Sequence, residues 1–108
     1  MNLHNPKPVI DTLQANGINT AFLFTLMPCQ ELALAINLQR KYAVLLETCQ
    51  HGIFCQTWLA NRNAQHESHC KLECYYSRPK TAQREIRAIH DHLQQLLYPH
   101  PLKDLLHL

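Results

Sequence analysis

The chain has 108 residues, of which 46% are hydrophobic and 17% are charged, and its formal net charge at pH 7 is +2. This length allows one domain with one core, and the composition argues against a disordered chain. The small net charge excludes a polycation that coats nucleic acid by bulk attraction, although a local basic patch stays open. We expect a single α+β domain over residues 1–98 and a leucine-rich tail over residues 99–108.

We expect neither a leader nor a membrane segment. The N-terminal stretch MNLHNPKPVIDTLQ lacks the basic-then-apolar pattern of a secretion signal. The longest apolar run, residues 21–27, is much shorter than the ~18 residues that a membrane helix needs. Five cysteines, an odd number without a secretion signal, fit reduced thiols better than a disulfide framework. We therefore expect a cytoplasmic protein without membrane association and without a cofactor.

The first predicted element is a short helix over residues 6–15, which ends where Gly17 can take a left-handed conformation. Residues 18–27 are rich in β-branched and aromatic side chains, which predicts a strand that ends at Pro28. Residues 29–40 are ambiguous, because alternating leucine and isoleucine favour a strand whereas strong helix formers favour a helix. We expect a helix there.

The middle of the chain predicts strands. YAVLLETC and IFCQTWLA flank a tight hairpin in which Gly52 can take a positive φ. After a polar loop, HCKLECYYS predicts a further strand, and residues 80–97 predict a long helix. The resulting fold class is α+β: a small single-layer antiparallel sheet of three to five strands, with an N-terminal helix and a long C-terminal helix packed on one face.

The last predicted helix has two faces. Its apolar stripe consists of Ala82, Ile86, Ile89, Leu93, Leu96 and Leu97. Nearly opposite lie Lys80, Arg84 and Arg87, within an arc of about 60°, and Arg78 stands just before the helix. We call these four cations the basic patch. Because cations at a helix N-terminus oppose the helix dipole, the patch is either a solvated face or a site that binds a phosphate or an acidic partner.

Strands followed by a helix with basic N-terminal residues resemble the arrangement of double-stranded-RNA-binding domains. In SRPKTAQR, residues 77–84, Lys80 and Ala82 are the positions that match the helix entry of that family. Pro79 departs from it, because the family carries another basic residue at this place. The likeness covers about eight residues and is an analogy of arrangement.

Cysteine and histidine residues suggest a metal only in the polar loop, where His66, His69 and Cys70 could fold around one ion. Strand geometry argues against a wider site, because Cys70 and Cys74 are about 13 Å apart on an extended strand. We expect the strand cysteines to face the core and no metal to be bound. Cys29 is the candidate nucleophile, since a helix N-terminus after a strand would stabilise its thiolate. The chain supplies no glycine-rich approach and no local histidine there, so we expect no enzyme.

The tail repeats the Leu-x-x-Leu-Leu spacing of the last helix. Its leucines are Leu102, Leu105, Leu106 and Leu108. They either dock back on the domain, fit a groove of a partner or form the seam of a homodimer. The leading prediction is a small non-enzymatic cytoplasmic binding protein, an adaptor, regulator or inhibitor of a protein partner, which uses the basic patch and the tail. RNA or DNA binding through the basic patch is the alternative, and a zinc- or thiol-dependent protein comes third.

Overall fold

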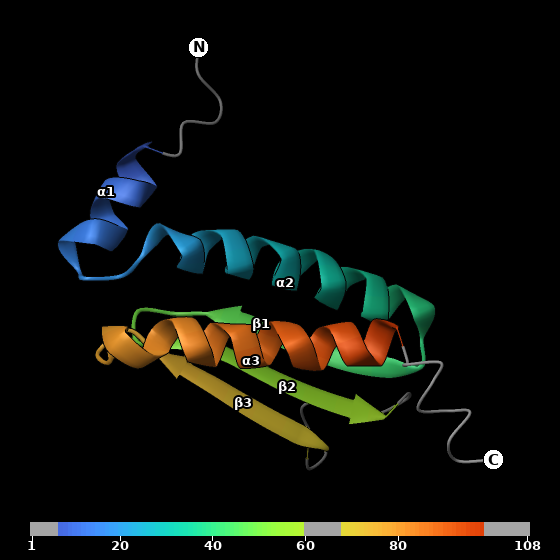
Figure 1. Ribbon diagram of the computed structural model, residues 1–108. Coiled ribbons are helices and arrows are strands. Elements are labelled where there is room, and N and C mark those ends of the chain that lie inside the picture. The colour runs from blue at the N-terminus through green and yellow to red at the C-terminus, as the bar shows by residue number, and fades with distance from the viewer. Residues whose placement is uncertain (1–6, 60–67, 99–108) are drawn as a thin grey trace, which may run out of the picture.

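The computed structural model describes residues 7–59 and 68–98 (Figure 1). Its elements are α1 (Lys7–Ala15), α2 (Thr20–Gln39), β1 (Tyr42–Thr48), β2 (Gly52–Leu59), β3 (Cys70–Tyr75) and α3 (Pro79–Leu97). The strands form an antiparallel sheet in the order β1-β2-β3. Helices α2 and α3 lie side by side and pack on one face of this sheet (Figure 1). The predicted α+β class, with helices on one face of a small antiparallel sheet, is confirmed.

Helix α2 is the main departure from the prediction. The strand expected over residues 18–27 is wrong: one helix of 20 residues runs from Thr20 to Gln39, with Pro28 inside it. Asn19 caps this helix, because its side chain accepts a hydrogen bond of 2.8 Å from the backbone N–H of Ala21. β-Branched and aromatic side chains favour strands only weakly, and here packing against α3 and β1 overrides that preference. The helix predicted for the second half is confirmed.

The strand residues alternate between two faces. Val44, Ile53, Cys55 and Cys74 point toward the helices and are buried. From α3, the apolar stripe meets them, and Ala82, Ile86, Ile89 and Leu93 are fully buried as the helical spacing predicts. Leu96 and Leu97 are half-buried against the same core.

One polar pair lies within this core. Thr57 on β2 is fully buried, and its hydroxyl lies 2.9 Å from Nε2 of His92 on α3. Burial lowers the pKa of His92, which favours the neutral imidazole. A neutral ring and a hydroxyl satisfy each other without placing a charge in the helix–sheet interface.

The side chain of Asn37 fixes α2 on the sheet. Its Nδ2 donates to the carbonyl oxygen of Val44 at 3.0 Å, and its Oδ1 accepts from the Val44 N–H at 2.8 Å. Strand β1 is an edge strand, so these backbone groups would otherwise face away from any neighbouring strand. The amide therefore sets the rotation of α2 about its own axis.

The glycines act for different reasons. Gly17 has a φ of 75° and follows α1, as predicted. Gly52 lacks the predicted positive φ, and the need for glycine there comes instead from a close approach of β2 and β3. A Cβ atom at Gly52 would lie 2.0 Å from the carbonyl oxygen of Cys74.

We expect the substitution Gly52→Ala to lower the free energy of unfolding by about 1–3 kcal/mol, since a backbone carbonyl would have to move to admit the methyl group. Urea denaturation followed by far-UV circular dichroism measures this. Gly17→Asn is the matched control, because asparagine tolerates a left-handed conformation and the space around Gly17 is open to 3.8 Å. An unchanged midpoint for Gly52→Ala would contradict the close approach of β2 and β3.

Candidate functional site

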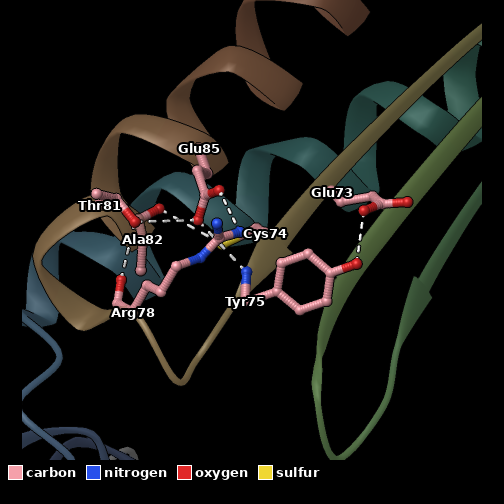
Figure 2. Close-up of polar contacts among 7 residues, drawn as sticks. All are labelled: Glu73, Cys74, Tyr75, Arg78, Thr81, Ala82 and Glu85. Carbon is pink, nitrogen blue, oxygen red and sulfur yellow. Dashed lines mark hydrogen bonds and ion pairs between the residues drawn. The ribbon is translucent and has the colours of Figure 1, made fainter.

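The basic patch at the start of α3 is divided. Arg78 is engaged within its own protein: its Nη2 lies 3.1 Å from Oε2 of Glu85, and its guanidinium carbon lies 4.9 Å from the ring centroid of Tyr75 (Figure 2). In contrast, Lys80, Arg84 and Arg87 are exposed, and no ion pair joins them to another residue in the described part of the chain. The free positive charge is therefore a stripe of three side chains on α3.

Glu85 explains how α3 tolerates cations at its positive end. Its Oε1 is 3.4 Å from both the backbone N–H of Tyr75 and the hydroxyl of Thr81, while its Oε2 faces Arg78 (Figure 2). Only 18% of the Glu85 side chain is exposed. A carboxylate in the second turn, tied to the first turn and to the end of β3, offsets the helix dipole. It also stands where an anion at the first turn would have to bind.

The face of the sheet that points away from the helices carries an aromatic pair. The rings of Phe54 and Tyr75 meet edge to face with centroids 5.6 Å apart. The Tyr75 hydroxyl donates to Glu73 at 2.5 Å (Figure 2), and this hydrogen bond raises the pKa of Tyr75. Because Glu73 stands beside Lys71 on β3, the strand carries mixed charge and adds no basic surface to the α3 stripe.

The setting predicted for Cys29 is wrong. This residue lies within α2 rather than at a helix N-terminus, it is fully buried, and its thiol donates to the carbonyl oxygen of Thr25 at 3.2 Å. Burial raises the pKa of Cys29 to about 12. Cys55 and Cys74 face the core as expected, and burial raises the pKa of each to about 11. These three thiols resist ionisation and are poor nucleophiles.

Two of the three candidate metal ligands, His69 and Cys70, lie within the described residues. His66 lies outside the described residues, His69 is exposed, and Cys70 is half-buried at the start of β3. In residues 7–59 and 68–98, no group of three histidine, cysteine or acidic side chains is placed to hold a metal ion. The tail leucines Leu102, Leu105, Leu106 and Leu108 also lie outside the described residues.

An exposed apolar face on α2 is the feature that the sequence reading missed. Phe24, Met27, Leu34 and Leu38 are 64%, 45%, 61% and 68% exposed, respectively. Their helical spacing places them within an arc of about 80°, together with one charged residue, Glu31. We call these four apolar residues the apolar face. Once residues 20–39 are treated as one helix, their spacing alone reveals it.

A groove lies beside the apolar face, between α2 and α3, with a volume of about 290 Å³. It is lined by Pro28, Glu31, Leu32 and Ala35 from α2, and by His90, Gln94, Leu97 and Tyr98 from α3. Glu31 thus belongs both to the arc of the apolar face and to the wall of the groove, so the two features are continuous.

Helix α2 is also long and apolar enough to cross a membrane, judged by length and composition alone. Residues 21–27, the apolar run that is too short to cross a membrane by itself, form only one part of α2. In this structure α2 instead forms half of the helical layer. Phe22 and Ile36 lie in the core, and Asn37 holds β1.

Comparisons of the chain with protein-family models, with curated proteins and with solved structures find no match in any of the three. The features of the molecule that bear on its function are therefore its fold, the apolar face and the cationic stripe.

The buried thiols give a direct test of the core. At pH 8 we expect a thiol reagent to modify the exposed Cys49 first and Cys70 more slowly, and to leave Cys29, Cys55 and Cys74 unmodified in the folded protein. A pKa of about 11 leaves roughly one thiol in a thousand ionised at that pH. Mass spectrometry of the time course identifies the sites, and in urea all five cysteines should react. Modification of native Cys29 at the rate of Cys49 would contradict this core.

Proposed function

We propose that this chain is a small non-enzymatic binding protein that acts in the cytoplasm as an adaptor, regulator or inhibitor, and that the apolar face of α2 docks a protein partner. The observation that carries this proposal is that four large apolar side chains, each at least 45% exposed, lie on one side of one helix. Large contiguous apolar patches on a folded domain mark interaction sites.

The shape and chemistry of the face indicate the kind of partner. The face is the convex side of a helix, so a partner fits it with a groove or with an apolar helix of its own. Full burial of a side chain such as Phe24 or Leu34 contributes about 1.5–3 kcal/mol. Glu31 lies within the arc of the face and favours a partner that places a cation opposite it.

The buried thiols argue against nucleophilic catalysis by Cys29, Cys55 or Cys74 and so support a binding role. The buried cysteines have raised pKa values, and the candidate nucleophile Cys29 has no exposed surface. A nucleophile needs an accessible, ionised group beside a base.

Polar substitution of the apolar face tests this proposal. We expect Phe24→Gln combined with Leu34→Gln to weaken binding of a partner identified with the parent protein by at least about 100-fold, roughly 2.8 kcal/mol. The two side chains are exposed, so the free energy of unfolding should change by less than about 0.5 kcal/mol.

Val9→Gln is the matched control, because Val9 is an apolar side chain on α1 that is 48% exposed and lies off the face. Titration calorimetry with the purified partner measures the affinities. Equal affinity for the parent and the double variant would refute the apolar face as the docking surface.

Nucleic-acid binding is the second candidate. It is favoured by the stripe of Lys80, Arg84 and Arg87, which has no ion pair within residues 7–59 and 68–98, and by the likeness to double-stranded-RNA-binding domains. Three phosphate contacts predict a slope of about −2 to −3 in the logarithm of affinity against the logarithm of salt concentration. Replacing Arg84 and Arg87 by Ala should reduce the size of that slope by about 2.

Filter binding of RNA and DNA duplexes at several salt concentrations measures the slope. Arg40→Ala is the control, because Arg40 is an exposed cation beyond the end of α2. The absence of any salt-dependent association would remove this candidate.

A further inference from the structure

The leucine-rich tail follows Tyr98 at the end of α3. We propose that Leu102, Leu105 and Leu106 dock on the Leu34–Leu38 half of the apolar face in the free protein. One consequence rests on the proposed function: the tail and a protein partner compete for this surface.

The path of the chain brings the tail to that half of α2. Helices α2 and α3 run parallel: near their N-terminal ends Gln83 donates to Thr25 at 3.2 Å, and near their C-terminal ends Tyr98 and Ala35 line one groove (Figure 1). Tyr98 is the last described residue. The ten residues that follow Tyr98 therefore start beside the last turns of α2. They start near Ala35, which is the next residue after Leu34 in the sequence.

The length of the tail limits how much of the face it can cover. Residues 99–101 span at most about 11 Å when extended, and residues 102–108 span about 10 Å as a helix. The apolar face measures about 21 Å from Phe24 to Leu38 along α2. As a helix, the contact from Leu102 to Leu106 is only about 6 Å long, which equals the distance from Leu34 to Leu38 along α2. It therefore covers the half of the face nearest Tyr98 and leaves Phe24 and Met27 uncovered.

The chemistry of the tail matches that half of the face. With helical spacing, Leu102, Leu105 and Leu106 share one side. Lys103 borders that side and can approach Glu31, the one charged residue within the arc of the apolar face. Burial of exposed leucines on both surfaces supplies the free energy of docking.

A second copy of the chain fits this face less well. The apolar positions lie nearly symmetrically about Glu31, at seven residues before it, four before, three after and seven after. A two-fold axis that packed α2 against α2 of another copy would therefore bring the two Glu31 carboxylates together. Like charges facing each other in an apolar contact oppose that pairing.

Methyl NMR of the full-length protein tests the proposal without any partner. We expect nuclear Overhauser contacts between the methyl groups of Leu105 or Leu106 and those of Leu34 or Leu38. Leu105→Gln combined with Leu106→Gln should abolish these contacts and shift the Leu34 and Leu38 signals. The Met27 signal should stay in place, because Met27 lies about 10 Å from Leu34 along α2, outside the half of the face that the leucines cover.

Asp104→Asn is the matched control, since Asp104 lies on the other side of a helical tail and should change none of these signals. The reciprocal variant, Leu34→Gln with Leu38→Gln, alters exposed positions only and should shift the tail methyl signals. This second variant keeps the test decisive if the tail variant fails to fold.

Unchanged Leu34 and Leu38 signals in the folded tail variant would overturn the proposal. So would tail contacts that appear only between labelled and unlabelled copies in a mixed sample, because these would assign the tail to a second chain. Neither outcome bears on partner binding through Phe24, because Phe24 lies outside the half of the face that the tail is proposed to cover.

Discussion

The paired hydrogen bonds between Asn37 and the backbone of Val44 decide which side of α2 meets the sheet. An amide that donates to the carbonyl and accepts from the N–H of one strand residue leaves the helix little freedom to turn. With Asn37 held at the edge of β1, Ile36 enters the core and its neighbour Leu38 points to the outside. The exposed face thus follows from a polar contact at the edge strand, although most of the α2 side chains are apolar.

On α3, charge is arranged in a different way. Glu85 draws Arg78, Thr81 and the end of β3 together, and this local network offsets the dipole at the start of the helix. The other three cations of α3, Lys80, Arg84 and Arg87, have no such partner among the described residues. The helical layer therefore presents an apolar surface on α2 and a cationic stripe on α3, and these suit ligands of different chemistry.

The sequence predicts the structure correctly where local pattern and packing agree. The stripe of α3 has a regular helical period, and the strands alternate, so the class of the fold and the core of α3 could be predicted. The prediction for residues 18–27 was wrong because their composition favours a strand. Pro28 was predicted to end that strand, whereas it lies inside α2. The close approach at Gly52 and the burial of Cys29 depend on residues distant in sequence, Cys74 and the α3 core, which no local pattern contains.

The same error explains why the sequence pointed to the tail leucines and the basic patch but not to α2. A strand with a following helix would divide the apolar residues between two elements, and neither would carry a conspicuous surface. As one helix, the segment has more apolar side chains than one core-facing side can hold, and the surplus must meet water or another surface. The tail that carries the other leucines starts at the end of α3 that borders the Leu34–Leu38 half of the apolar face. Two apolar surfaces that are costly to expose separately are stabilised when they cover each other.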